Sequence, residues 1–182
     1  MKLLLLPIFA TLLVSLPLSG FAAGDTEFVR NGDLKEGREF PTHWRVTNES
    51  ETLISHEAIS EYVSYESDNE GHKALILKST TGLTCVTQID RETTLDPNGK
   101  YQLSAEVKVS GTTSGYLRIA VTPFEWVHYH CVLDLKNQAD VWEKVVANFT
   151  PKAGETGLRI VLMARDFEGT ASIRNISLVK LD

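Results

Sequence analysis

The segment Pro123–Cys131 holds the side chains best suited to contact a ligand, in the order PFEWVHYHC. In a strand, alternate side chains point to the same side, so Trp126, His128 and His130 would share one face and Tyr129 and Cys131 the other. A core-facing Cys131 would then turn Trp126 and both imidazoles outward. One exposed indole beside two hydrogen-bonding rings is typical of a ligand platform. For Trp126, a loop cover or a contact between copies is an equally open alternative, because single exposed apolar residues need no special explanation.

The two imidazoles of this segment suggest two further kinds of chemistry. On one strand face His128 and His130 would be placed to coordinate a metal, but a tight site needs more ligands and the sequence assigns no third one. We therefore favour hydrogen bonding over metal binding. His128, Tyr129 and His130 also form the one cluster that hints at acid–base catalysis, because the sequence shows no nucleophile elbow, metal-binding helix or phosphate-binding glycine loop. We expect a chain without catalytic activity.

Strands must position these side chains, and the sequence is rich in strand patterns. Apolar and polar residues alternate over 101–109, and further β-branched runs occur at 74–79, 116–121, 158–163 and 173–181. Turn residues separate the runs at 96–99, 110–115, 152–155 and 167–169. Residues 58–65 fit a helix or a strand equally well, and the irregular apolar spacing after Ile173 indicates a bulge. The pattern predicts an all-β fold, an antiparallel β-sandwich of the jelly-roll type.

Residues 1–23 have the pattern of a secretory signal peptide. Lys2 is followed by the apolar run Leu3–Leu16 and by a small-residue cleavage site at Ala22 and Ala23. We expect residues 24–182 to form one mature domain that is secreted, either extracellular or periplasmic. The full chain has 18 basic and 24 acidic residues, a formal charge of −6, and it loses a further positive charge with Lys2. This acidic balance argues against nucleic acid and against an anionic membrane surface as partners.

The chain has two cysteines, Cys85 and Cys131. Both lie in strand-like segments, and an even number of cysteines in an exported protein favours a disulfide between neighbouring or facing strands. The alternative is two buried thiols that pack as small hydrophobic side chains.

Four stretches of the chain together resemble a known family. The first is Phe28–Gly37, FVRNGDLKEG, with Pro41 and Trp44 behind it. The others are Pro97–Lys108, then Trp142–Val145 followed by Asn148–Thr150, and finally Ala171–Val179, ASIRNISLV. In this order they resemble the carbohydrate-binding modules of the family 4/9/22 type, which are galactose-binding-like jelly rolls.

The resemblance implies a protein that binds a poly- or oligosaccharide and does not cleave it. The expected ligand is neutral, and a separate carbohydrate-active enzyme is a possible partner. A protein-interaction or adhesion module and a small secreted polysaccharide-degrading enzyme stay open as alternatives. Trp44 and Trp142 match positions that serve the fold in these modules, so we expect both in the core. Trp126 lies in a run that departs from the family pattern.

Aromatic rings stack on the C–H face of a sugar while polar side chains bind its hydroxyl groups. Besides the residues of Pro123–Cys131, the candidates for this role are strand residues that would line a groove. Arg118 and Gln88 are the first choices among them, because both are long, forked donors. The others are Tyr116, Gln102 and Glu106.

Many of the resembled modules also contain a structural Ca²⁺, held by acids of the opening and closing motifs. Here the opening acid position is Lys35, with Glu36 beside it, and the closing pair is Arg174 and Asn175. Calcium prefers several oxygen ligands and gains affinity from carboxylate charge. We therefore expect no cofactor, with Glu36 and Asn175 as the weak calcium candidates.

Overall fold

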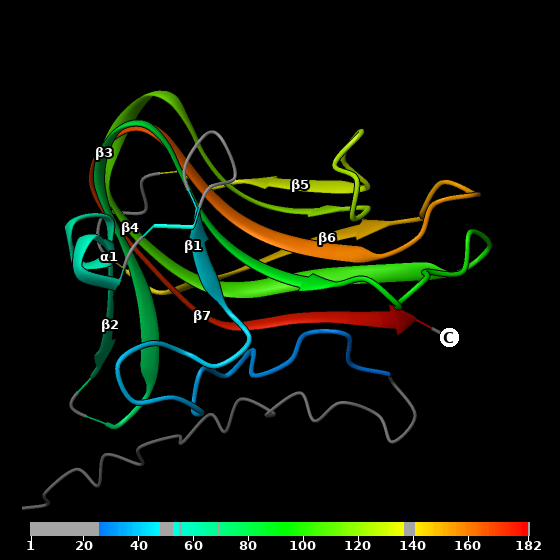
Figure 1. Cartoon of the computed structure of the whole chain (residues 1–182), viewed down its shortest axis with the longest axis horizontal. Helices are drawn as coiled ribbons and strands as arrows, with labels where there is room; N and C mark the ends of the chain where they lie inside the picture. The colour runs from blue at the N-terminus through cyan, green and yellow to red at the C-terminus, as the bar shows by residue number, and fades with distance from the viewer. Residues whose placement is uncertain (1–25, 48–52, 55, 69, 137–140, 182) are drawn as a thin grey trace, which may run out of the picture.

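The computed structural model describes residues 26–47, 53–54, 56–68, 70–136 and 141–181, so the expected signal peptide lies outside the described residues. In chain order the elements are β1 (Arg45–Thr47), α1 (His56–Tyr62), β2 (Val63–Ser67), β3 (Lys73–Asp90), β4 (Lys100–Thr122), β5 (Cys131–Asp134), β6 (Glu143–Phe149) and β7 (Leu158–Leu181) (Figure 1). The undecided stretch 58–65 contains the end of α1 and the start of β2. In the described part of the chain no helix is long and apolar enough to cross a membrane.

Three long strands, β3, β4 and β7, bend in the middle and contribute to two layers of sheet (Figure 1). In the first layer the order is β6, β4, β7, β3, β2. The second half of β7 and the start of β3 belong to this layer. In the second layer the order is β5, β4, β7, β3, β1. All of these pairings are antiparallel, so the predicted all-β sandwich is confirmed.

Glycines mark the place where β4 and β7 bend together. Gly111 pairs with Gly169, and both have a positive φ, 153° and 134°. A Cβ atom on Gly169 would lie 2.1 Å from the carbonyl oxygen of Ser110, a distance that no side chain allows. The turns predicted at 110–115 and 167–169 are therefore wrong, because both segments are bends inside continuous strands. Glycine, serine and threonine favour both arrangements, and local sequence does not separate them.

The main core lies between the two layers. Tyr101, Leu103, Ala105, Val107 and Val109 of β4 point into it, as their alternation predicts, and all are buried. They pack against buried side chains from β3 and β7, namely Leu75, Leu77, Val86, Leu162, Ile173 and Leu178. Each fully buried aliphatic side chain contributes about 1.5–3 kcal/mol to folding.

The opening and closing motifs contact one another. The amide of Ile176 donates to the carbonyl oxygen of Gly32 at 2.9 Å, and a Cβ on Gly32 would lie 1.9 Å from the Ile176 carbonyl oxygen. The indole of Trp44 is buried, as expected, and donates to the carbonyl oxygen of Asn31. Beside this contact the pairing of β4 with β7 shifts register between Ser104 and Glu106, which confirms the predicted bulge in the last strand.

The predicted disulfide is wrong, and the alternative of two buried thiols is correct. Cys85 lies on β3 and Cys131 on β5, and strands β7 and β4 stand between them. At about 4.8 Å per strand the separation is far beyond the ~7 Å Cα distance that a disulfide spans. Cys131 belongs to the main core, whereas Cys85 packs in a separate cluster on the other side of the second layer. Burial raises the pKa of Cys131 to about 11, so its thiol stays protonated.

Candidate functional site

Residues 123–130 form a loop between β4 and β5, so the predicted strand alternation does not apply to them. The amide of Trp126 donates to the carbonyl oxygen of Pro123, and the amide of His130 donates to that of Val121 at 2.8 Å. Trp126 has a φ of 54°, in the left-handed region. Since the chain reverses here, Trp126 and the two histidines do not share a strand face.

Trp126 packs across the outer side of the second layer. Cys85, Ala120, Val161 and Met163 form a small apolar cluster there, and the half-buried indole lies against it. The guanidinium carbon of Arg159 lies 4.6 Å from the indole centroid. Arg159 also donates to the carbonyl oxygen of Phe124 at 3.0 Å, so the loop is attached to the sheet beneath it.

Tyr116, Arg118 and Tyr129 lie on the same side of the second layer. By strand alternation Tyr116 and Arg118 point outward while Leu117 points into the core, as the burial pattern shows. The Arg118 guanidinium lies 4.1 Å from the Tyr116 ring centroid. The Tyr129 hydroxyl contacts the Met163 sulfur at 4.0 Å, and the Tyr129 side chain stays exposed. Burial raises the pKa of Tyr116, which keeps its hydroxyl protonated.

We call this side of the second layer the aromatic face, defined by Tyr116, Trp126, Tyr129, Arg118 and Arg159. Asp134 borders it and binds Arg118 in an ion pair with an N–O distance of 3.0 Å. The face thus combines three aromatic rings with two guanidinium groups. Such a surface can stack against a flat apolar ligand and donate paired hydrogen bonds at its edge. The sequence interpretation named four of the five residues and missed Arg159, which lies within a predicted strand.

Gln88, a candidate from the sequence, lies elsewhere. It is buried, and its amide nitrogen donates to the carbonyl oxygen of Arg30 at 2.6 Å while its amide oxygen accepts from the Arg30 amide at 2.8 Å. These two bonds hold the opening segment against β3. The expectation that Gln88 lines a groove is therefore wrong.

His128 and His130 form a second group, together with Glu155 of the loop between β6 and β7. The Nε2 atoms of His128 and His130 lie 2.9 and 3.6 Å from Oε2 of Glu155. The His130 side chain is 3% exposed, so the predicted role in surface hydrogen bonding does not suit it. Burial is the main cause that lowers the pKa of His130, and its imidazole is neutral at neutral pH. Glu155 lies in the loop between the turn at 153–154 and β7, and the sequence interpretation did not name it as a candidate.

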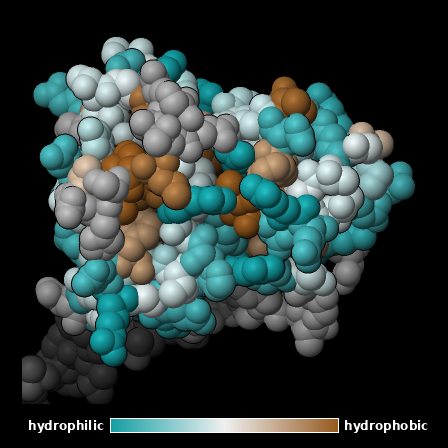
Figure 2. Space-filling view, viewed as in Figure 1, coloured by the Kyte–Doolittle hydropathy of each residue, from teal (hydrophilic) through white to brown (hydrophobic). Residues whose placement is uncertain are grey.

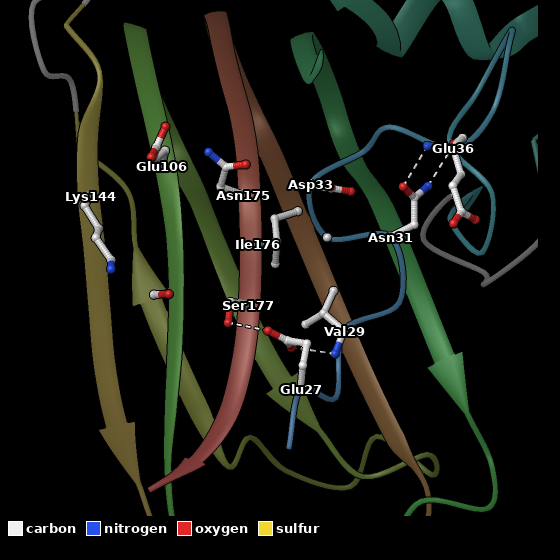
Figure 3. Close-up of a pocket in the computed structure, with 12 residues that line it drawn as sticks. Glu27, Val29, Asn31, Asp33, Glu36, Glu106, Lys144, Asn175, Ile176 and Ser177 are labelled. Atoms are coloured by element: carbon white, nitrogen blue, oxygen red, sulfur yellow. Dashed lines mark hydrogen bonds between the residues drawn. The ribbon is translucent and has the colours of Figure 1, made fainter. Parts of the chain in front are cut away.

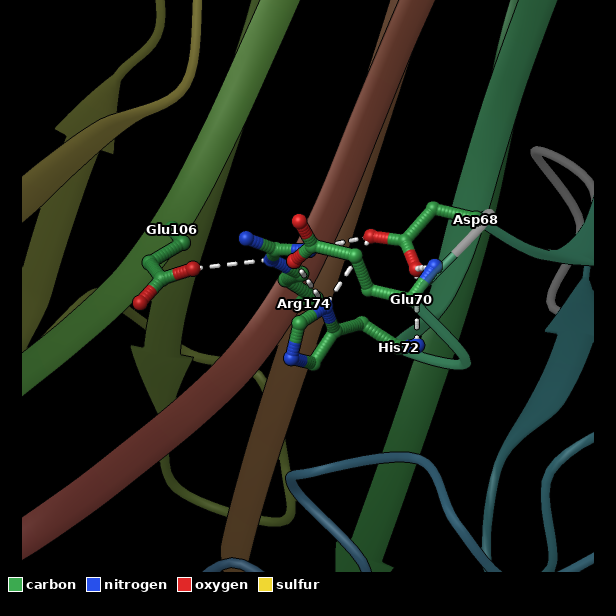
Figure 4. A network of polar contacts seen from close by, with 5 residues as sticks. All are labelled: Asp68, Glu70, His72, Glu106 and Arg174. Carbon is green, nitrogen blue, oxygen red and sulfur yellow. Dashed lines mark hydrogen bonds and ion pairs between the residues drawn. The ribbon is translucent and has the colours of Figure 1, made fainter.

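Trp142 is not in the core, contrary to expectation. It lies half-buried on the outer side of the first layer, 4.2 Å from the Arg174 guanidinium and 5.9 Å from the Lys108 ammonium. Figure 4 shows Arg174 between Glu106 and Asp68, with ion-pair distances of 2.8 and 3.0 Å. Trp142 is a single ring on the first layer, whereas the aromatic face brings three rings together.

A polar pocket of about 550 Å³ lies beside the opening motif, and both calcium candidates line it (Figure 3). Glu36 accepts from the Thr42 hydroxyl, and Asn175 stands apart from it on β7. The carboxylate of Glu27, also in the pocket, accepts from the amides of Val29 and Leu178. Among the described residues, two groups of three acidic or histidine side chains bring their ligand atoms together. Neither group includes Glu36. Calcium takes about six to eight oxygen ligands, backbone carbonyls included, so the expectation of no calcium stays a prediction.

Comparison with known proteins places this fold among carbohydrate-binding modules. A solved module, TmCBM61 in complex with β-1,4-galactotriose, superposes with a TM-score of 0.57 at 12% identity, over 86% of this chain and 99% of that one. A cyclase from Fischerella sp. TAU superposes with a TM-score of 0.62 at 14% identity, over 84% of this chain and 96% of that one. At these identities the likeness shows the fold alone.

A larger solved protein also contains this fold. The enzymatically active domain of tailspike protein 4 from bacteriophage CBA120 superposes with a TM-score of 0.59 at 15% identity, over 85% of this chain. This chain spans only 21% of that protein's length. No curated protein matches the sequence. The profile of the CBM_4_9_1 family, described as BppA domain 1, matches residues 29–178, and the chain therefore belongs to this family of carbohydrate-binding modules.

Proposed function

We propose that this protein is a secreted, non-catalytic carbohydrate-binding module that holds a poly- or oligosaccharide on its aromatic face. Membership of a carbohydrate-binding family supports a carbohydrate-binding role. The observation that carries the choice of site is the convergence of Tyr116, Trp126 and Tyr129 with two arginines on one side of the second layer. Secretion rests on the leader pattern of residues 1–23.

The chemistry of the face suits a sugar ring. A pyranose presents a flat array of C–H bonds, on which an indole or a phenol ring stacks with little loss of side-chain entropy. Arg118 can then donate a forked pair of hydrogen bonds to adjacent hydroxyl groups. One solved module of similar fold, TmCBM61, was determined in complex with such a ligand, β-1,4-galactotriose.

The surroundings of Trp126 favour a sugar over a protein partner. Arg159 belongs to the face and Asp134 borders it, so charged groups lie beside the rings. On the side of the molecule that Figure 2 shows, separate hydrophobic patches stand between hydrophilic side chains. Protein-docking surfaces are usually larger and continuous.

The charges of the chain and of the aromatic face bear on whether the ligand is neutral or acidic. The acidic net charge of the chain disfavours an acidic polysaccharide, whereas two arginines on the face favour one locally. We propose a neutral glycan, because Arg118 is already neutralised by Asp134. A separate carbohydrate-active enzyme would be the partner that such a module serves.

Native gels cast with soluble polysaccharides test the proposal. The panel should contain neutral β-glucan, galactan and xylan together with one acidic polysaccharide, and the mature chain should run beside Trp126→Ala, Tyr116→Ala and Trp142→Ala. We expect retardation by a neutral polysaccharide that falls at least about tenfold in apparent affinity in the first two variants. Trp142→Ala is the matched control and should bind like the parent.

Three outcomes would contradict parts of this proposal. Loss of binding only in Trp142→Ala would place the site on the first layer. Retardation only in the acidic gel would exclude a neutral ligand. Release of reducing ends from any of the polysaccharides would show that the protein is an enzyme.

A further inference from the structure

His128, His130 and Glu155 bring two imidazoles and one carboxylate together at one end of the sandwich. The loop after β4 carries the histidines and the loop before β7 carries the glutamate, and both loops lie at the same end in Figure 1. One ligand atom from each of the three side chains lies within 4.8 Å of the other two. The sequence interpretation named the two histidines as candidates, and the fold places Glu155 beside them.

The three side chains are partly buried, and each has one fully buried polar atom that makes no hydrogen bond. Nε2 of His128 and Oε2 of Glu155, two of the atoms that an ion would bind, have no hydrogen-bond partner among the described residues. Nδ1 of His130 is also unpaired, but Nε2 is the atom of that ring that lies 3.6 Å from Glu155. Although Nε2 of His128 lies 2.9 Å from Oε2 of Glu155, the pair lacks hydrogen-bond geometry. A buried polar atom left unpaired costs about 1–3 kcal/mol, so such a group calls for a partner.

The distances match the coordination sphere of a small cation. Zinc binds imidazole nitrogen at about 2.0–2.1 Å and carboxylate oxygen at about 2.0–2.2 Å, which puts two tetrahedral ligands about 3.3 Å apart. The observed Nε2–Oε2 distances of 2.9 and 3.6 Å lie on either side of this value. Small side-chain shifts would therefore admit the ion.

The exposure of the group leaves room for a fourth ligand. The His130 side chain is 3% exposed, whereas those of His128 and Glu155 are 19% and 21% exposed. One side of the group thus faces solvent, where a water molecule can complete the tetrahedron and where the ion can enter. The ring of Phe149 stacks on that of His130, with 6.2 Å between the ring centroids.

We propose that His128, His130 and Glu155 form a binding site for a divalent transition metal of the zinc type. Two nitrogen donors and one oxygen donor suit Zn²⁺, Co²⁺ or Ni²⁺, and they exclude Ca²⁺ as the preferred ion because calcium takes oxygen ligands. The ion would join the loop that carries Trp126 to the loop before β7. The site is distinct from the aromatic face and does not depend on any sugar being bound.

Calorimetric titration of the untagged mature chain with ZnCl₂, after treatment with a chelator, tests this site. We expect one equivalent of Zn²⁺ to bind and the melting temperature to rise. Zinc affinity should fall at least about tenfold in His128→Ala and in Glu155→Gln, which nearly preserves side-chain shape. Bound Co²⁺ should show visible absorption of a tetrahedral nitrogen and oxygen site in the parent alone.

The exposed group Asp68, Glu70 and His72 provides the matched control, since its ligand atoms also converge. His72→Ala should leave zinc binding unchanged, and CaCl₂ should not compete. The proposal is overturned if the parent shows no saturable Zn²⁺ binding, if both site variants keep it, or if His72→Ala abolishes it. Circular dichroism of each metal-free variant separates loss of the site from loss of the fold.

Discussion

Replacing Gln88 with leucine tests whether this residue serves the fold and not the ligand. The change keeps the approximate volume but removes both hydrogen bonds to the backbone of Arg30. Each bond contributes about 0.5–1.5 kcal/mol net, and each backbone group left unpaired adds a penalty if it stays buried. Both bonds are only partly buried, so water relieves some of the penalty. We expect the free energy of unfolding to fall by about 2 kcal/mol.

The measurable consequences follow from the size of the domain. At about 2–4 °C per kcal/mol, the melting temperature should fall by about 4–8 °C. The polysaccharide affinity of the folded protein should stay unchanged, because Gln88 points away from the aromatic face. The assay pairs a thermal unfolding curve with affinity gels that are run at a temperature well below the transition.

Gln102→Leu is the matched control for this test. Gln102 lies on the outer side of the first layer, and its amide donates to the exposed Asn148 side chain at 3.0 Å. Its replacement should move the melting temperature by less than about 2 °C, since exposed polar contacts contribute little. A Gln88→Leu protein that melts like the parent but no longer binds polysaccharide would refute the structural role.

Two further predictions concern the bend and the thiols. Gly169→Ala should lower the free energy of unfolding in urea by at least about 3 kcal/mol, because its Cβ would lie 2.1 Å from the Ser110 carbonyl oxygen. Gly154→Ala is the control. It should lower that free energy by only about 1 kcal/mol, because a Cβ there has nothing within 4 Å. A similar cost at both glycines would contradict the close crossing of β4 and β7. Cys85 and Cys131 should react with a thiol reagent only after the protein is unfolded, and no reducing agent should be needed. The intact mass should then show two added groups. A mass two units below the reduced value would instead show an oxidised pair.

The strands were predictable from sequence because their pattern is local. Tyr101 to Val109 alternate with polar residues, and one side of that strand faces the core while the other faces solvent. The bends at Gly111 and Gly169 were mistaken for turns, because the same residue types serve both. What distinguishes them is the pairing of β4 with β7 on either side of the bend, which is not a local property.

Alternation failed where both sides of a strand are buried. Cys85 and Thr87 of β3 point to one side and Val86 and Gln88 to the other, yet all four are buried. A period of two then no longer tells core from outer surface, which is why the orientation of Gln88 and the cysteine pairing were misjudged. The position of Trp126 was equally hidden, because its loop depends on a left-handed residue that no sequence pattern required.

The sequence nevertheless contained one indication that the outer side of the second layer is covered. Ile160–Ala164 is apolar at every position, which in an antiparallel sheet indicates that something covers the outer side as well as the inner. The structure shows that Trp126 contributes to this cover, because it packs against the cluster that contains Val161 and Met163. The indole therefore stabilises the fold in addition to any role in ligand binding. Its removal would expose apolar surface. Tyr116→Ala, whose ring lies at the border of the cluster, separates stacking from covering more cleanly than Trp126→Ala does.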